Sequence, residues 1–153
     1  MKYTLRHVRD ADYEFLYRLK VVCLKEYVEA IWGWDEARQR RHFAVKFDPA
    51  ASRIVVAFGR DAGQLSIEER PEEIYLNGIY LLPAYQGQGL GSQILRDVMA
   101  GAKQSDRPVR LQVLAGNPAR RLYERLGFVV TGRNDTHFLM SSGRRADTSV
   151  ETV

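Results

Sequence analysis

The chain has 153 residues, of which 45% are apolar and 27% are charged, and its formal net charge at pH 7 is +4. This length favours a single domain with its own hydrophobic core. No apolar run approaches the ~18 residues of a membrane-spanning helix, and the first residues lack the apolar core of a signal peptide. Cys23 is the only cysteine, which excludes an internal disulfide, so we expect a cytoplasmic protein without a membrane partner.

The basic residues are scattered along the chain and never form a run of about five. An anionic ligand explains the positive excess as well as a nucleic acid does, so nucleic acid is not an expected partner. We expect no metal site either.

The first half of the chain alternates between strand and helix patterns. Asp10 and Asp35 are suitable helix N-caps, Gly33 breaks the first helix, and residues 59–63 have turn chemistry. The predicted elements are a strand at 3–8, a helix between Asp10 and Gly33, a helix at 36–47, and strands at 53–58 and 64–69.

The second half continues the pattern as far as residue 140. The predicted elements are a strand at 73–82, a helix at 92–104, a strand at 109–114, a helix at 118–126, and an antiparallel pair at 128–133 and 136–140. Residues 141–153 are polar and without a period, so we expect one domain at 1–140 followed by a flexible tail.

A glycine-rich loop at 86–91 joins the strand at 73–82 to the next helix. It reads Gln86, Gly87, Gln88, Gly89, Leu90, Gly91. Glycines expose backbone N–H groups, and a helix N-terminus adds partial positive charge, so this turn suits a phosphate. A Walker loop would need Gly-Lys-Ser/Thr and a dinucleotide fingerprint would need G-x-G-x-x-G, and neither spacing is present. A turn that merely requires glycine stays open.

A second motif, Asn117 followed by Leu122-Tyr123-Glu124-Arg125-Leu126-Gly127-Phe128, comes after the strand at 109–114. With these two motifs the chain resembles the GNAT superfamily, the Gcn5-related N-acetyltransferases. Their first motif is Gln/Arg-x-x-Gly-x-Gly/Ala, matched by Gln86, Gly89 and Gly91. The resemblance extends over residues 1 to about 140 and implies an α/β (α+β) fold with a mixed, mostly antiparallel sheet of about six or seven strands, splayed fourth and fifth strands and about four helices.

The resemblance also implies acetyl-CoA as the cosubstrate. The pantetheine arm would pair with the main chain of the fourth strand, while the loop would hold the pyrophosphate. Asn117 matches a pantetheine contact, but it lies six residues before Tyr123 where many members have seven, so a helix N-cap role is equally open. The expected coenzyme-binding residues are Ile79, Tyr80, Leu81, Gln86, Gly87, Gln88, Gly89, Leu90, Gly91, Ser92, Asn117 and Tyr123.

Acyl transfer to an amine needs a neutral amine and a proton for the departing thiolate. The resemblance assigns the general acid to Tyr123. Glu68 is our candidate base, with Glu69 and Glu73 as other candidates. A water relay through Asn77 or Tyr80 would need no carboxylate, and a solvated Glu68 without any role is as good an interpretation.

The resemblance further implies that the acceptor binds between the first two helices and the sheet. Trp32 and Trp34 flank Gly33 and suit an aromatic wall, although a hydrophobic staple that locks the helix junction explains them slightly better. The expected acceptor-binding residues are Glu26, Tyr27, Trp32, Trp34, Tyr75 and Asn77.

We therefore predict an acetyl-CoA-dependent N-acetyltransferase that modifies a primary amine of a small molecule in a ternary complex. A protein or peptide N-acetyltransferase is the alternative enzyme, and a non-catalytic acyl-CoA sensor is the alternative from another class. The sequence does not decide between a monomer and a homodimer.

Overall fold

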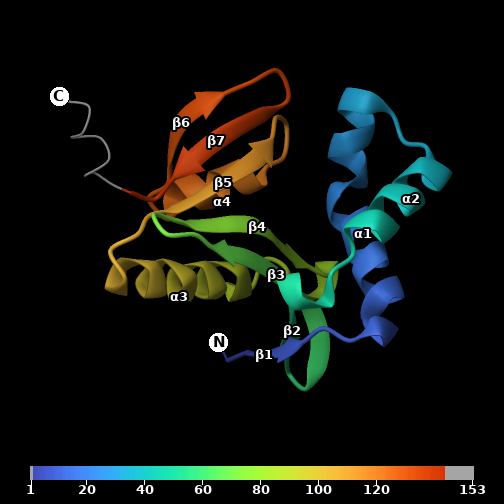
Figure 1. The fold of residues 1–153 in the computed structure, drawn as a ribbon, viewed down its shortest axis with the longest axis horizontal. Helices are drawn as coiled ribbons and strands as arrows, with labels where there is room; N and C mark the ends of the chain where they lie inside the picture. The colour runs from blue at the N-terminus through green and yellow to red at the C-terminus, as the bar shows by residue number, and fades with distance from the viewer. Residues whose placement is uncertain (1, 144–153) are drawn as a thin grey trace. The chain divides into compact units, whose positions relative to one another are not determined.

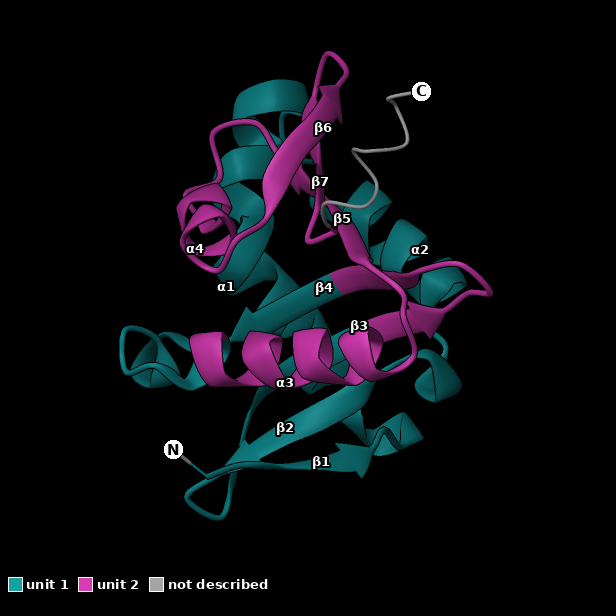
Figure 2. Ribbon diagram, turned by 90° about the vertical axis from the view of Figure 1, so that its left-hand side faces the viewer, with its two compact units in different colours: residues 1–66, 78–91 teal, residues 67–77, 92–153 magenta. Residues whose placement is uncertain are grey.

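The computed structural model describes residues 2–143. The chain divides into two compact units (Figure 2): unit 1 comprises residues 1–66 and 78–91, and unit 2 comprises residues 67–77 and 92–153. Most of the predicted tail, 144–153, lies outside the described residues, so the domain at 1–140 and the flexible tail stay predictions.

Eleven regular elements, four α-helices and seven strands, follow one another within the described residues (Figure 1). Their order confirms the succession predicted from the pattern. They are β1 (Thr4–His7), α1 (Tyr13–Trp32), α2 (Glu36–Lys46), β2 (Arg53–Ala57), β3 (Arg60–Glu69), β4 (Ile74–Leu81), α3 (Leu90–Gln104), β5 (Val109–Leu114), α4 (Ala119–Arg125), β6 (Val129–Arg133) and β7 (His137–Ser141).

The strands form one sheet in the order β1-β2-β3-β4-β5-β7-β6. β4 and β5 are parallel, and α3 is the helix of the crossover that connects them. Their pairing covers only Ile74–Leu76 against Val109–Leu111, although β4 continues to Leu81 and β5 to Leu114. The predicted splay of the fourth and fifth strands is thereby confirmed.

In unit 1, local signals define the junction between α1 and α2. Gly33 ends α1 with φ +80°, and its N–H donates to the Glu29 carbonyl at 2.9 Å. The Asp35 carboxylate accepts from the Arg38 N–H at 3.1 Å and so caps α2, as predicted. The Tyr13 ring of α1 then packs edge to face against Phe43 of α2, at 5.2 Å, and against Phe47 directly after α2, at 5.1 Å.

The core of unit 1 lies between α1 and the first strands. Val8, Leu16, Leu19 and Ile54 are its buried centre. Each such side chain contributes about 1.5–3 kcal/mol by leaving water. In unit 2 the most buried apolar side chains are Ile94, Leu95, Val109, Phe128 and Met140.

The turn predicted at 59–63 is wrong in its extent. Phe58 and Gly59, with φ values of +54° and +73°, make a two-residue hairpin turn, and β3 begins at Arg60. Gly63 instead lies inside β3, where an added Cβ would collide with the Tyr80 carbonyl oxygen. The sequence indicated correctly that glycine is needed at position 63. The reason is the close approach of β3 and β4, and not a turn.

Asp10 does not cap α1, contrary to our prediction. Residues Asp10–Asp12 form a short 3-10 turn, and α1 begins at Tyr13. The buried Asp12 carboxylate accepts from the Arg9 N–H at 2.8 Å and from the Arg6 guanidinium at 2.8 and 3.0 Å. The hydrogen bonds from Arg6 lower the pKa of Asp12 to about 2.

Replacing Asp12 by asparagine is expected to lower the free energy of unfolding by about 2 kcal/mol at neutral pH, because the ion pair with Arg6 is lost. The folded pKa lies below the usual 3.8, so this stability is present above pH 3.8 and disappears as the pH falls to about 2. Urea unfolding of wild type and variant, at neutral pH and near pH 2, measures both the loss of stability and its pH dependence. Asp10→Asn, at an exposed neighbour, is the control, and an undiminished difference near pH 2 would contradict the account.

Candidate functional site

The glycine-rich loop leaves β4 through a short 3-10 turn at Pro83–Tyr85 and enters α3 at Leu90. The Gln86 N–H donates to the Pro83 carbonyl at 3.1 Å, and residues 86–89 are exposed. Gly87 and Gly89 have φ values of +73° and +88°. An added Cβ would meet nothing within 4 Å at either position, so the backbone conformation, and not crowding, requires glycine there.

The first turn of α3 follows this loop directly. The N–H groups of a first helical turn have no intrahelical acceptor, and the helix dipole places partial positive charge there. Leu90 is buried at 1% exposure and anchors the turn, whereas Gly91 and Ser92 are half-buried. The loop and the first turn can therefore bind an anionic group through the main chain.

The Gln86 side chain ties the loop back to the end of β4. Its Nε2 donates to the Leu81 carbonyl oxygen at 2.8 Å. The same oxygen accepts from the Cys23 thiol of α1 at 3.3 Å. Burial raises the pKa of Cys23, which keeps the thiol protonated and suits its role as a donor. Sequence reasoning treated Gln86 only as a coenzyme ligand and missed this brace.

The C-terminal part of β4 supplies the other expected coenzyme residues of unit 1. Leu81 is buried, and Ile79 and Tyr80 are half-buried. The Tyr80 ring lies over Gly78, where an added Cβ would come within 2.7 Å of its hydroxyl oxygen. Burial raises the pKa of Tyr80 to about 12, so the phenol stays protonated at neutral pH.

In unit 2, α4 carries Asn117 before its first turn and Tyr123 near its centre. The Asn117 Oδ1 accepts from the Ala119 N–H at 2.9 Å, an Asx turn that leads into α4, whose N-cap is Pro118. Tyr123 is 7% exposed, and its ring lies 5.7 Å from the Phe128 ring. The Phe128 N–H donates to the Tyr123 carbonyl at 3.0 Å, so the turn after α4 brings Phe128 back beside Tyr123.

The acidic residues considered as bases belong to a network of ion pairs in unit 2. Arg70 donates to Glu68 at 3.1 Å and to Glu73 at 2.7 Å, and Arg110 donates to Glu73 at 2.7 Å. The hydrogen bond from Arg70 lowers the pKa of the exposed Glu68. Arg70 also stacks 4.3 Å from the centre of the Tyr75 ring. Glu69 pairs with Arg107 at 3.2 Å.

The residues expected to bind the acceptor are divided between the units. In unit 1 the Trp34 Nε1 donates to Glu36 at 3.0 Å, and the Tyr17 hydroxyl donates to the other Glu36 oxygen at 2.9 Å. Hydrogen bonds from Trp34 and Tyr17 lower the pKa of Glu36, a residue that the sequence analysis did not single out. Trp32 is 59% exposed. Four others complete the set: exposed Glu26 and half-buried Tyr27 in unit 1, and half-buried Tyr75 and exposed Asn77 in unit 2.

No group of three or more His, Cys, Asp or Glu side chains among residues 2–143 could hold a metal ion. No helix in this part of the chain is both long enough and apolar enough to cross a membrane.

A family model described as an acetyltransferase (GNAT) domain matches residues 35–130 of the sequence. The match includes both motifs and begins at the residue that caps α2. A search of curated proteins found no match.

Several solved structures share the fold at low sequence identity. The PaiA N-acetyltransferase of Thermoplasma acidophilum, solved with coenzyme A, is 18% identical with a TM-score of 0.75, covering 94% of this chain and 100% of that one. Arabidopsis thaliana Naa50, solved with the bisubstrate analogue CoA-Ac-MVNAL, is 17% identical with a TM-score of 0.64 and coverages of 94% and 100%. The ribosomal-protein-S18-alanine N-acetyltransferase of Escherichia coli is 22% identical with a TM-score of 0.65 and coverages of 92% for both chains.

Proposed function

Because the chain belongs to the GNAT family of acetyltransferases, we propose that it transfers the acetyl group of acetyl-CoA to a primary amine of a small molecule. The observation that carries the proposal is the loop after β4, where left-handed Gly87 and Gly89 precede the first turn of α3. The coenzyme A complex of the Thermoplasma neighbour supports the choice of donor.

The loop fits the diphosphate of coenzyme A. Its glycines leave open space where a side chain would stand, and the first turn of α3 adds main-chain donors. We assign the diphosphate to residues 87–92 and the pantetheine arm to the main chain of Ile79, Tyr80 and Leu81. We assign a second contact for this arm to Asn117, whose side chain accepts from the Ala119 N–H at the start of α4. Acetyl-CoA supplies an acyl group that its thioester activates for attack by nitrogen.

Two side chains of this chain serve the transfer. Tyr123 donates the proton that the departing thiolate takes up, since a phenol is suited to protonating a thiolate. Glu68 receives the proton of the attacking amine, directly or through water. Its ion pair with Arg70 lowers its pKa and makes it a weak base, so a water relay through Asn77 or Tyr80 is the alternative.

A peptide amine is the second candidate acceptor. The Naa50 complex with a peptide-bearing analogue and the ribosomal-protein acetyltransferase from E. coli favour it. Glu26, Tyr27, Trp32, Trp34, Tyr75 and Asn77 are the residues we propose for either acceptor.

Thiol release from acetyl-CoA tests the proposal, with a panel of small primary amines beside peptides that carry free N-termini. We expect release with at least one small amine. Release with peptides alone would replace the small-molecule acceptor by the peptide. Binding of acetyl-CoA without release for any amine would identify a sensor and overturn the enzymatic proposal.

Gln86→Leu is expected to weaken acetyl-CoA binding about tenfold, because a hydrogen bond worth about 1–2 kcal/mol no longer holds the loop against β4. Gln86→Arg restores a donor to the Leu81 carbonyl and should bind nearly as wild type. Calorimetry on the three proteins measures this. Unchanged affinity in Gln86→Leu would show that the brace does not organise the loop.

A further inference from the structure

The outer side of α2 carries a concentration of positive charge that the proposed function does not use. Arg38, Arg41, His42, Val45 and Lys46 are all exposed, and Val45 is 84% exposed. Their spacing of three or four residues places them along one side of a helix. We call these five residues the basic face of α2.

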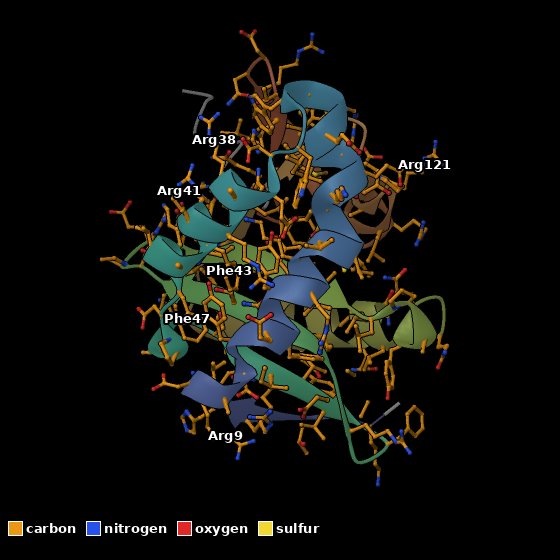
Figure 3. All side chains as sticks on the ribbon, turned by 90° about the vertical axis from the view of Figure 1, so that its right-hand side faces the viewer. Arg9, Arg38, Arg41, Phe43, Phe47 and Arg121 are labelled. Carbon is orange, nitrogen blue, oxygen red and sulfur yellow. The ribbon has the colours of Figure 1, made fainter. Side chains whose placement is uncertain are left out.

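The opposite side of α2 holds the helix in place. Phe43 and Phe47 pack against the Tyr13 ring of α1 at 5.2 and 5.1 Å. Figure 3 shows Arg38 and Arg41 on the outer side of α2, while Phe43 lies on the side toward α1. The basic face therefore takes no part in attaching α2 to its own unit.

The charges of the basic face are not neutralised within the described part of the chain. Arg40, on the inner flank of α2, pairs with Glu14 at 2.9 Å and with Glu36 at 3.7 Å. Arg38, Arg41 and Lys46 form no ion pair with any residue among 2–143. Asp35, at the helix start, accepts from the main-chain N–H of Arg38.

Helix stability does not explain this arrangement. Arg38 lies in the first turn of α2, where the helix dipole disfavours a cation, and Arg41 follows it at a spacing where like charges repel. Lys46 alone occupies the last turn, where a cation is favoured. An anionic partner would offset both the unfavourable interaction of Arg38 with the helix dipole and the repulsion between Arg38 and Arg41.

We propose that the basic face of α2 binds an acidic segment of a polypeptide, with carboxylates on Arg38, Arg41 and Lys46 and an apolar side chain on Val45. Carboxylates pair with arginine in a bidentate manner. Sites for single-stranded nucleic acid usually combine several aromatic rings on which successive bases stack, whereas the basic face has a single such ring, the imidazole of His42. Its exposed Val45 instead suits an aliphatic side chain of a peptide.

Fluorescence anisotropy of a labelled glutamate- and leucine-rich peptide, blocked at both ends, tests the proposal on the full chain at low salt. The blocked peptide has no free amine, so the outcome is independent of acetyl transfer. We expect binding that weakens about tenfold in the Arg38→Glu/Arg41→Glu variant, since two exposed ion pairs are lost and reversed. Arg38→Gln/Arg41→Gln, without reversed charge, should show a smaller loss.

The matched control is Arg60→Glu/Lys103→Glu, which changes the net charge equally at exposed positions outside the basic face. Its peptide affinity should stay within about threefold of wild type. Equal losses in both variants, or no binding to wild type, would overturn the proposal. Tighter binding of a single-stranded RNA that displaces the peptide and depends on the same arginines would assign the face to nucleic acid instead.

Discussion

Gly89→Glu is expected to abolish acetyl-CoA binding while leaving the protein folded. Gly89 has φ +88°, a conformation that costs an L-residue about 1–2 kcal/mol. The new carboxylate would also stand beside the proposed diphosphate site and repel it. Thermal unfolding with and without acetyl-CoA measures the effect, because a ligand that binds only the folded state raises Tm. We expect the ligand-induced shift in wild type to vanish in the variant.

Two control variants separate the causes. Gly89→Ala introduces the backbone strain without the charge and should weaken binding by about tenfold. Gly101→Glu places the same charge near the other end of α3, at an exposed position where an added Cβ meets nothing within 4 Å, and should bind normally. A full ligand-induced shift in Gly89→Glu would mean that the glycines serve the turn alone.

Tyr123→Phe is expected to reduce kcat about a hundredfold with little change in acetyl-CoA affinity, because proton donation by a side chain typically contributes at least that factor. Phenylalanine keeps the ring that packs 5.7 Å from Phe128, so the fold of α4 is retained. Steady-state thiol release gives kcat, and calorimetry gives the affinity.

Tyr13→Phe removes a hydroxyl from the α1–α2 packing and serves as the control for a lost phenol. Its kcat should match wild type. If Tyr123→Phe retained full kcat, water or another group would have to protonate the thiolate, and Tyr123 would be a packing residue only.

The elements that the sequence predicted best are those whose limits depend on local chemistry. Gly33 ends α1 because the chain turns into a left-handed conformation there, and Asp35 caps α2 with its own carboxylate. Both signals are readable from a few neighbouring residues. The prediction that Asp10 caps α1 was wrong. Asp12, two residues later, pairs with Arg6, and the identity of that partner is not readable from the residues next to Asp10.

The features that the sequence did not predict depend on contacts between distant residues. Gly63 is required by the Tyr80 carbonyl of the neighbouring strand, so it resembles a turn glycine in the sequence alone. The brace from Gln86 and Cys23 to the Leu81 carbonyl joins three separate segments. Likewise, the ion pair that lowers the pKa of Glu68 depends on where the turn before β4 places Arg70.

The two motifs could be predicted from the sequence better than the acceptor residues, because each motif combines local geometry with a fixed order of residues. Gly87 and Gly89 of the loop adopt positive φ values, as glycine readily does, and the family model covers both motifs. Trp34 is instead held by Glu36, a partner that no spacing rule identifies. Thiol release with the panel of amines and peptides is therefore the measurement that identifies the acceptor.

Isothermal titration calorimetry of the full chain with acetyl-CoA tests the central claim most directly. The account predicts saturable binding at one site per chain with a Kd on the order of micromolar, equivalent to about −8 kcal/mol. Absence of binding under conditions where the protein is folded would contradict it, because the loop after β4 would then be a structural turn and the proposed acetyl transfer would have no donor.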